Sequence, residues 1–376
     1  MIIVKREIQN GIEKSLFKGK IIIIYGARQV GKTTLIREIQ KKYSNDSLYV
    51  NCDEPDIRQA LTNKTSTELK NFIGNKRLIL IDEAQRVINI GLALKLLVDN
   101  YPDIQVIATG SSSFDLSNQI IEPLTGRKHE FYLYPFSFSE LKTIYSELEL
   151  NRLIENRIIF GMYPDVVLKY DESENLLREI SRSYLYKDVL QYQNIKSPDL
   201  LERLLQALAL QIGNEVSYNE LAVTVGVDKK TIASYISLLE KAFIIFRLNP
   251  YSRNLRNELR KLRKIYFVDT GIRNALINNL NPLNLRGDTG NLWENFLISE
   301  RIKLIKNKNI VRNTFFWRTH QQYELDYIEE EKGKLFGYEF KWNKKTFKEP
   351  KIFIETYPGS EVNLINRNNY QHFLEI

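Results

Sequence analysis

Residues 21–34 read Ile-Ile-Ile-Ile-Tyr-Gly-Ala-Arg-Gln-Val-Gly-Lys-Thr-Thr, and this stretch decides the fold. It begins with a β-branched apolar run and continues into the spacing G-x-x-x-x-G-K-[ST]. A helical pattern follows, with Leu35, Ile36 and Ile39 on one face. A strand, a glycine-bounded turn and a helix in this order form a phosphate-binding loop. The loop is therefore expected to bind a nucleoside triphosphate.

The chemistry of the loop assigns roles to its polar groups. Glycine at both ends allows a tight turn, so that backbone N–H groups and the N-terminus of the helix face the phosphates. Lys32 is expected to bridge the β- and γ-phosphates, and the Thr33 hydroxyl to bind Mg²⁺. The predicted nucleotide-binding residues of the loop are Gly26, Ala27, Arg28, Gln29, Val30, Gly31, Lys32, Thr33 and Thr34.

A later apolar strand, at residues 77–81, ends in the adjacent carboxylates Asp82 and Glu83, as a Walker B element does. Beside the loop, Asp82 would hold Mg²⁺ through its water shell and Glu83 would orient the water that attacks the γ-phosphate. The guanine-reading motif N-K-x-D does not occur, because Asn-Lys at 75–76 is followed by Arg-Leu. The sequence therefore predicts ATP and Mg²⁺ as cofactors, with Glu83 and Lys32 as catalytic residues.

The next apolar strand ends at Thr109 and leads into Gly110 and three serines. Related ATPases place a side chain that senses the γ-phosphate at this position. Thr109 and Ser111 are the candidates for this role. The alternative is that both are ordinary turn and N-cap residues ahead of a helix near Phe114.

Several stretches resemble one protein family along nearly the whole chain. They are Gly-Ala-Arg-Gln-Val-Gly-Lys-Thr-Thr-Leu at 26–35, Leu-Ile-Leu-Ile-Asp-Glu-Ala-Gln at 78–85, Thr-Gly-Ser-Ser at 109–112, Leu-Thr-Gly-Arg at 124–127, Tyr-Pro-Phe-Ser-Phe-Ser-Glu at 134–140 and Gly-Met-Tyr-Pro at 161–164. Together they look like the prokaryotic AAA-type ATPases that carry a C-terminal domain of the DUF4143 kind. The resemblance implies a P-loop core of the additional-strand type, with Glu83 as the catalytic acid and Arg127 as an arginine that contacts phosphate.

Composition limits the cellular setting. The 376 residues include one cysteine, Cys52, so no internal disulfide can form, and this suits a reducing cytosol. The first residues are charged and lack the apolar core of a signal peptide, and no apolar run approaches the ~20 residues of a membrane span. We expect a soluble, cytoplasmic protein without membrane contact.

Residues 199–275 carry the pattern of a winged helix-turn-helix, in which helices are followed by two strands. The net charge of +8 is concentrated here, since residues 200–280 hold 12 Lys and Arg against 7 Asp and Glu. The segment around the loop between the two strands, the basic wing, holds Arg253, Arg256, Arg260, Lys261, Arg263 and Lys264. This pattern predicts contact with duplex DNA or, equally, with a protein partner.

Residues 276–376 have the element order α-β-β-β-α-β, which resembles the core of PD-(D/E)xK nucleases. Asp326, Glu339 and Lys341 fit the spacing D-x12-E-x-K, and Glu294 lies on the preceding helix. Glu294, Asp326 and Glu339 are the predicted metal ligands, and Lys341 would support the attacking water. Alternating charged and apolar residues also describe a half-exposed strand, so a nuclease-like fold without activity stays open.

The sequence thus predicts an α/β chain with four parts. They are a P-loop ATPase domain with a parallel sheet at 1–145, a helical connector at 146–198, a winged helix at 199–275 and a nuclease-like domain at 276–376. The favoured function is an ATP-hydrolysing switch coupled to the C-terminal region, with DNA as a candidate target. The alternatives are a metal-dependent nuclease gated by ATP and an ATP-sensing interaction module whose nuclease-like fold is inactive. Association of several copies of the chain also stays open.

Overall fold

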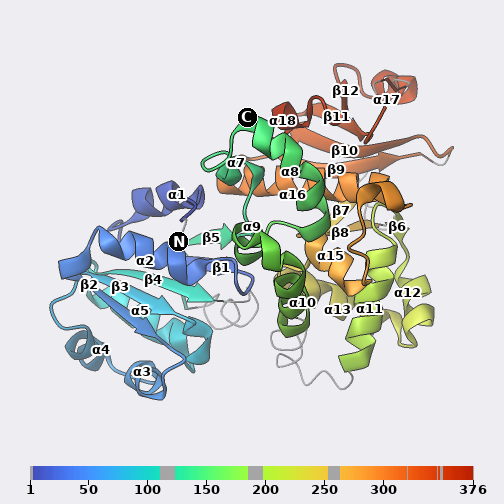
Figure 1. Ribbon diagram of the computed structural model, residues 1–376. Helices are drawn as coiled ribbons and strands as arrows, with labels where there is room; N and C mark the ends of the chain where they lie inside the picture. Colours follow the sequence, from blue (N-terminus) through green and yellow to red (C-terminus); the bar gives the residue numbers. More distant parts are fainter. Residues whose placement is uncertain are drawn as a thin grey trace. The chain divides into compact units, whose positions relative to one another are not determined.

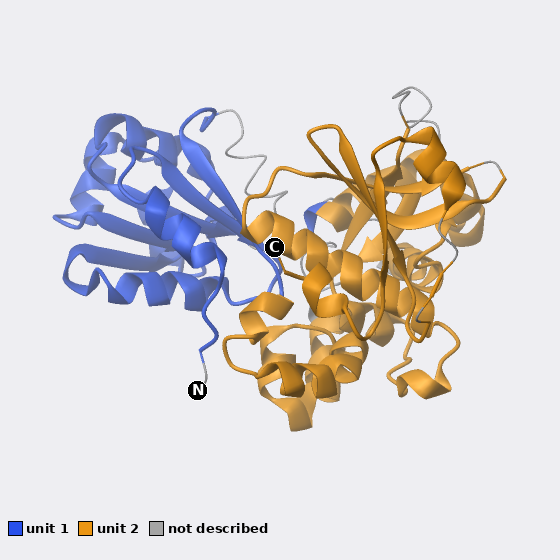
Figure 2. Ribbon diagram, turned by 90° about the horizontal axis from the view of Figure 1, so that it is seen from above, with its two compact units in different colours: residues 1, 3–135, 241–243 blue, residues 2, 136–240, 244–376 orange. Residues whose placement is uncertain are grey.

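The structure is a computed structural model, and it describes residues 3–110, 123–184, 198–252, 263–319, 321–344, 346–347 and 350–375. The chain divides into two compact units (Figure 2). The first holds residues 3–135 and 241–243, and the second holds 136–240 and 244–375. The connector, winged-helix and nuclease-like segments, predicted as separate domains, therefore share one compact unit.

The first unit alternates strands and helices (Figure 1). Its strands are β1 (Ile21–Gly26), β2 (Ser47–Asn51), β3 (Leu78–Asp82), β4 (Gln105–Gly110) and β5 (Lys128–Leu133). Its helices are α1 (Ile8–Ser15), α2 (Lys32–Lys41), α3 (Pro55–Leu61), α4 (Ser66–Ile73) and α5 (Ile90–Asn100), with short 3₁₀ turns η1 (Ser44–Asp46) and η2 (Ala84–Arg86).

The five strands form one parallel sheet in the order β2-β3-β4-β1-β5. Strand β4 lies between β1, which precedes the phosphate loop, and β3, which ends in Asp82. Every residue of β1, β3 and β4 is buried, because helices cover both faces of a parallel sheet and its central strands are apolar throughout. The predicted α/β fold with a parallel sheet is confirmed.

The second unit begins with helices and continues into mixed structure. The helices are α7 (Phe138–Leu141), α8 (Glu147–Phe160), α9 (Pro164–Leu168), α10 (Ser173–Tyr184), α11 (Pro198–Leu210), α12 (Tyr218–Val225), α13 (Lys229–Lys241), α15 (Thr270–Leu276), α16 (Thr289–Asn307), α17 (Lys351–Thr356) and α18 (Tyr370–Phe373), with 3₁₀ turns η3 (Tyr170–Glu172) and η5 (Leu283–Leu285). The strands are β6 (Glu215–Val216), β7 (Ile245–Pro250), β8 (Arg263–Phe267), β9 (Asn313–Arg318), β10 (Glu324–Glu331), β11 (Lys334–Phe340) and β12 (Glu361–Ile365).

One seven-stranded sheet runs through this unit in the order β12-β11-β10-β9-β7-β8-β6. The link is a parallel pairing of β7 with β9, where Asn249 lies opposite Phe315 and Pro250 opposite Phe316. The strands of the predicted wing and those of the predicted nuclease-like domain are therefore parts of a single sheet. The sequence boundary at 275/276 falls between elements that this sheet joins.

Helix α16 is the central helix of the second unit and is buried over most of its length, including its charged residues. Arg301 donates from Nε to Glu329 Oε1 on β10 at 2.6 Å, and Lys303 Nζ lies 2.7 Å from Glu300 Oε1. A charge removed from water is costly unless an opposite charge accompanies it. These pairs therefore explain how the three charged residues Glu300, Arg301 and Lys303 can lie inside the unit.

Among the residues that the structure describes, none of the helices has the length and apolar composition that crossing a membrane requires.

Helices α8 and α15 pack tightly against each other at Gly271. A Cβ added there would lie 2.1 Å from the carbonyl oxygen of Phe160, a backbone atom that cannot move aside. We expect Gly271→Ala to lower the free energy of unfolding by roughly 1–3 kcal/mol, because overpacking forces the backbone to shift. Urea unfolding of the whole chain would measure this change.

Gly290 provides the matched control. It lies exposed in the first turn of α16 with no atom within 4 Å of an added Cβ. Gly290→Ala should leave stability unchanged or raise it by about 0.4–1 kcal/mol, since alanine restricts the unfolded chain. Equal stability of the two variants would contradict the close approach at Gly271.

Candidate functional site

The phosphate loop joins the end of β1 to the start of α2. Gly26 is required by space, because an added Cβ would lie 2.3 Å from the carbonyl oxygen of Leu133 on β5. Gly31 has φ 93°, a left-handed value that favours glycine. The predicted residues 26–34 thus form one continuous turn that ends on the first residues of a ten-residue helix, the arrangement that binds phosphate groups.

Lys32 is buried at the base of the loop. Its ammonium donates to the carbonyl oxygens of Gly26 at 2.9 Å and Ala27 at 2.7 Å. These contacts hold the positive charge inside the turn, where the β- and γ-phosphates of a nucleotide would lie. Phosphate oxygens carry more negative charge than carbonyls, so a bound nucleotide would exchange places with these acceptors.

Asp82 is the centre of the hydrogen bonds at this edge of the sheet. The Thr33 hydroxyl donates to Asp82 Oδ2 at 2.6 Å, and the Tyr49 hydroxyl donates to the same oxygen at 2.9 Å. The Thr109 hydroxyl donates to Asp82 Oδ1. The structure therefore brings together the predicted residues Thr33, Asp82 and Thr109 around one carboxylate.

Tyr49 was not predicted from the sequence. It lies on β2, which pairs in parallel with β3. Burial, with a further contribution from Asp82, raises the pKa of Tyr49 to about 12. The signal for this residue is strand direction, because polar residues near the carboxyl ends of neighbouring parallel strands meet at one edge.

The residues at this edge fit Mg²⁺. Mg²⁺ prefers oxygen ligands, and it usually keeps several waters and uses one or two protein groups together with substrate phosphates. The Thr33 hydroxyl donates a hydrogen bond to Asp82, and this leaves the lone pairs of the hydroxyl oxygen available to a metal. Thr33 would therefore hold Mg²⁺ directly and Asp82 would hold it through water.

Glu83 has an unusual backbone. Its φ of 51° is left-handed, which is rare for a residue with a side chain. Its N–H donates to Asp82 Oδ1 at 3.2 Å and to Thr109 Oγ1 at 3.3 Å, while Gln85 Nε2 donates to Glu83 Oε2 at 2.5 Å. Backbone strain of this kind collects at active sites. Gln85, which sequence reasoning missed, fixes the orientation of the predicted catalytic carboxylate.

The structure describes one of the two candidates for a γ-phosphate sensor, Thr109, and not the other. Thr109 is fully buried at the end of β4 and bonds Asp82, so it positions the carboxylate instead of pointing freely at a phosphate. Ser111 lies outside the described residues.

Arg127 lies at the wrong edge of the sheet for a contact with its own loop. The N–H of Ile21, the first residue of β1, donates to the Arg127 carbonyl at 2.9 Å, whereas Gly26 at the other end pairs with Leu133. Six strand residues separate the two edges by roughly 20 Å. Arg127 Nε instead lies 2.6 Å from Asp99 Oδ1. An arginine contact from Arg127 to a nucleotide in the same chain is therefore excluded.

Arg6 contacts the phosphate loop through its guanidinium, and no motif in the sequence marks it as a site residue. Its Nη1 donates to the Val30 carbonyl in the loop at 2.6 Å, and its Nη2 donates to the Tyr134 carbonyl at 2.5 Å. The side chain is buried. It therefore ties the phosphate loop to the segment that follows β5.

The residues of the predicted nuclease-like site lie in one neighbourhood of the second unit. Asp326 lies on β10 and its Oδ2 accepts the Phe340 N–H at 2.8 Å. Glu339 lies on β11, 2.6 Å from Lys341 Nζ. Glu294 on α16 accepts a hydrogen bond from the Tyr266 hydroxyl at 2.5 Å.

Burial raises the pKa of all three carboxyl groups, Glu294, Asp326 and Glu339. Asp326 adds to this effect for the other two through repulsion. Yet within the described ranges, no group of three or more Asp, Glu, His or Cys side chains could hold a metal ion. The predicted ligands therefore lie in one neighbourhood, but the described residues do not arrange three of them as a metal site.

The basic wing is only partly described. Arg253, Arg256, Arg260 and Lys261 lie outside the described residues. Arg263 lies at the start of β8, 6.0 Å from the ring centre of Tyr218. Lys264 is 1% exposed and bonds Glu294 and Glu324, so it belongs to the interior and not to an exposed basic surface. Lys264 is not part of an exposed wing because β8 lies between β6 and β7 in the sheet.

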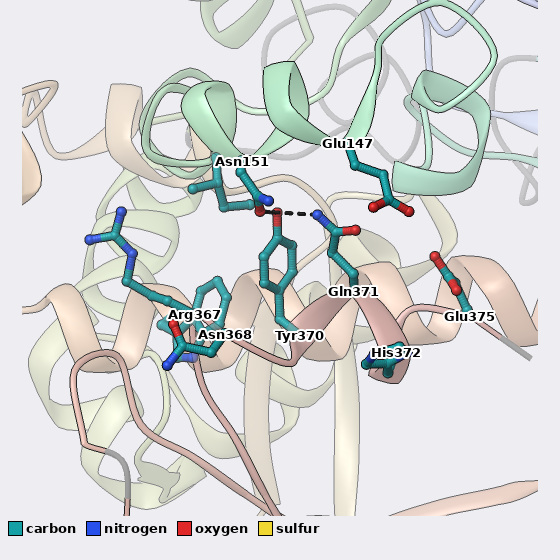
Figure 3. A pocket seen from close by; sticks show the side chains of 10 residues that line it. Glu147, Asn151, Arg367, Asn368, Tyr370, Gln371, His372 and Glu375 are labelled. Carbon is teal, nitrogen blue, oxygen red and sulfur yellow. Dashed lines mark hydrogen bonds between the residues drawn. The ribbon is translucent and has the colours of Figure 1, made fainter.

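A polar pocket of 680 Å³ lies between α8 and the C-terminal segment (Figure 3). The Tyr370 hydroxyl and Gln371 Nε2 both donate to Asn151 Oδ1, at 2.9 and 3.0 Å. Arg367 pairs with Glu155 at 3.0 Å. The described lining of this pocket contains none of the predicted site residues.

Comparison with protein families matches three parts of the chain. The matches are an AAA domain at residues 18–142, a domain of unknown function (DUF8612) at 151–283 and a domain of unknown function (DUF4143) at 289–372. The AAA match contains the phosphate loop, Asp82 and Glu83. The DUF8612 match runs through the predicted connector and winged helix together.

The chain matches most of the length of several longer relatives that are described as uncharacterized proteins. One from Methanocaldococcus jannaschii is 28% identical over 346 residues, covering 85% of this chain and 74% of the relative. One from Mycobacterium tuberculosis is 26% identical over 345 residues, covering 91% and 74%.

Among solved structures, the Aeropyrum pernix ORC1 protein in complex with DNA has a TM-score of 0.36 and 14% identity, covering 74% of this chain and 93% of that one. A similarity this weak supports no functional argument. The family matches do agree with the resemblance noted from the sequence motifs. This chain is therefore an AAA-domain protein with a C-terminal DUF4143 domain.

Proposed function

We propose that this chain is a Mg²⁺-dependent ATPase that acts as a switch for its C-terminal region. The observation that carries the proposal is the hydrogen-bonded group of Thr33, Asp82 and Thr109 beside the phosphate loop. It joins the hydroxyl that would bind the metal, the carboxylate that would orient it and Thr109 near the end of β4 in one hydrogen-bonded group. Such preorganisation is what phosphoryl transfer needs, since positioning and charge stabilisation supply most of its catalysis.

The residues divide the work as follows. The loop backbone and Lys32 bind the phosphates and stabilise the charge that develops on them. Mg²⁺, when bound, neutralises charge on the β- and γ-phosphates. Glu83, held by Gln85 at 2.5 Å, orients the attacking water toward the γ-phosphate. Thr109 keeps the Asp82 carboxylate turned toward Thr33.

Two substitutions separate binding from hydrolysis. Lys32→Ala should abolish ATP binding, because the ammonium inside the turn is lost. Glu83→Gln should keep ATP binding and slow hydrolysis by roughly 10²-fold or more, because the amide cannot accept a proton from water. Binding of a fluorescent ATP analogue and phosphate release would measure the two effects.

Lys41→Ala is the matched control, since Lys41 ends the same helix but pairs with Glu38 at the surface. It should leave both measurements unchanged. Normal turnover by the Glu83 variant would remove Glu83 from the mechanism.

We further propose that Arg127 acts on the nucleotide of another copy of the chain. Arg127 lies too far from the phosphate loop of its own chain. The phosphate contact that the family resemblance implies would therefore have to be made with a nucleotide bound to another copy. Arg127 is exposed beside Asp99, so it is accessible to a second copy. ATP hydrolysis by oligomers would then need the loop of one chain and Arg127 of its neighbour.

A mixing experiment tests this route. Arg127→Ala and Glu83→Gln should each be inactive alone, while their mixture should regain part of the activity because mixed oligomers contain intact sites. Activity of Arg127→Ala alone, or a mixture that stays inactive while mixed oligomers form, would rule out the contribution in trans. Phosphate release at several protein concentrations supplies the measurement.

For the second unit we propose a winged helix-turn-helix formed by α11, α12, α13 and the strands β6 to β8. The antiparallel pairing of β7 with β8, and of β6 with β8, supports this assignment. Helix α13 would be the recognition helix. Its first turn carries the exposed residues Lys229 and Lys230, capped by Asp228, and this favours contact with phosphates of duplex DNA over an apolar protein surface.

Salt dependence tests the DNA contact. Replacing Lys229 and Lys230 by Gln should weaken duplex binding and reduce the slope of log affinity against log salt by about 1.8, which is two phosphate contacts at 0.9 each. Lys332→Gln with Lys334→Gln, in the exposed β10–β11 turn, is the control pair. An equal slope in both double variants would favour a protein partner for α13.

The order α16-β9-β10-β11-α17-β12 supports a nuclease-like fold for the DUF4143 domain. Asp326 and Glu339 lie on neighbouring antiparallel strands, as that fold requires. However, each carboxylate is already held by a donor of the chain. We therefore propose the inactive form of this fold, an interaction module, in preference to a nuclease gated by ATP.

A further inference from the structure

A group of four carboxylates and two ammonium groups lies inside the second unit. The carboxylates are Glu294, Glu324, Asp326 and Glu339, and the ammonium groups belong to Lys264 and Lys341. Lys341 lies at the exposed side and pairs with Glu339 at 2.6 Å. Lys264 pairs with carboxylates on the buried side of the group. This inference concerns Lys264 and does not depend on the proposed ATPase.

Lys264 reaches this group from β8, outside the nuclease-like segment. Its Nζ lies 3.1 Å from Glu294 Oε1 on α16 and 2.5 Å from Glu324 Oε1 on β10. The side chain is 1% exposed. Asp326 lies two residues after Glu324 on the same strand. Burial alone would lower the pKa of Lys264, but the charges of Glu294, Asp326 and Glu324 raise it above its usual value. The ammonium is thus charged and pairs with carboxylates of two other elements, α16 and β10.

Buried carboxylates need a positive charge close by, because burial of an unpaired charge costs several kcal/mol. In metal-dependent nucleases a divalent cation held by two or three carboxylates meets this need. Here an ammonium meets it from 3.1 Å and 2.5 Å. A divalent ion bound by Glu294 would lie within a few ångströms of this ammonium and would be repelled by it.

We infer that the Lys264 ammonium holds the place of a metal ion in the carboxylate group, so that the DUF4143 domain keeps its fold and charge without a metal. Two further contacts fit this role. Tyr266, two residues along β8, donates to the same Glu294 oxygen at 2.5 Å, and Arg318 Nη1 approaches Glu324 Oε2 at 3.8 Å. The carboxylate oxygens that would face a metal are thus directed at donors of the chain itself.

Direct Mn²⁺ binding tests the inference. The experiment uses the full chain with Lys32→Ala, which disables the ATP site, and follows the electron paramagnetic resonance signal of free Mn²⁺. With Lys264 present, we expect Lys32→Ala and the double variant Lys32→Ala, Asp326→Asn to take up the same amount of Mn²⁺. Equal amounts would mean that no Mn²⁺ uptake depends on Asp326. With Lys264→Met, we expect uptake of about one Mn²⁺ per chain, since two carboxylates and water satisfy this class of ion. Lys264→Arg keeps the charge and should not take up Mn²⁺.

Asp326-dependent uptake with Lys264 in place would overturn the inference, and so would the absence of uptake by Lys264→Met. Stability provides a second measurement if that variant folds poorly. Lys264→Met should lower the melting temperature by roughly 10 °C, because it leaves buried carboxylates without their cation. Adding Glu294→Gln should restore much of this loss. If the two substitutions are simply additive, the ammonium does not serve Glu294 as its counter-charge.

Discussion

The AAA domain depends on the hydrogen bonds that the carboxylate of Asp82 accepts. This carboxylate accepts hydroxyl hydrogen bonds from Thr33 on α2, from Tyr49 on β2 and from Thr109 on β4. Three neighbours of β3 are thus fixed to the end of one strand. This contact requires β4 to lie between β1 and β3 and β2 to lie on the other side, as the order β2-β3-β4-β1-β5 provides. The geometry of the candidate site therefore depends on the order of the strands in the sheet.

The site was predictable where its residues are contiguous. Gly26 to Thr34 and the pair Asp82-Glu83 follow apolar strands directly, and parallel strands bring their carboxyl ends to one edge. Arg127 shows the limit of a short motif. It precedes a strand, so strand direction alone would have placed it at the opposite edge, although the motif associates it with phosphate. Arg6 could not be found, because its contacts with Val30 and Tyr134 depend on packing between distant segments.

In the second unit, too, contacts between residues close in sequence were predictable, whereas contacts between distant segments were not. The alternation of β11 correctly brings Glu339 and Lys341 together, because these residues are local to one another. The sequence does not indicate that Lys264 reaches Glu294. That contact depends on the parallel pairing of β7 with β9, which fuses the strands of two predicted domains into one sheet. Lysines in a basic run are usually solvated, and only the position of β8 inside the sheet reverses this expectation for Lys264.

The two carboxylate groups of the chain differ in where their positive charge comes from. At Asp82 the hydroxyl partners are neutral, so in the proposed mechanism this carboxylate would gain a cationic partner only when Mg²⁺ binds with a nucleotide. At Glu294 the positive charge is part of the chain and stays in place whatever is bound elsewhere. A charge that comes and goes can shift an equilibrium between two states, whereas a fixed charge cannot, because only differential binding moves such an equilibrium. The proposed switch therefore belongs to the AAA domain, and the DUF4143 domain is suited to a constant surface that the switch presents or withholds.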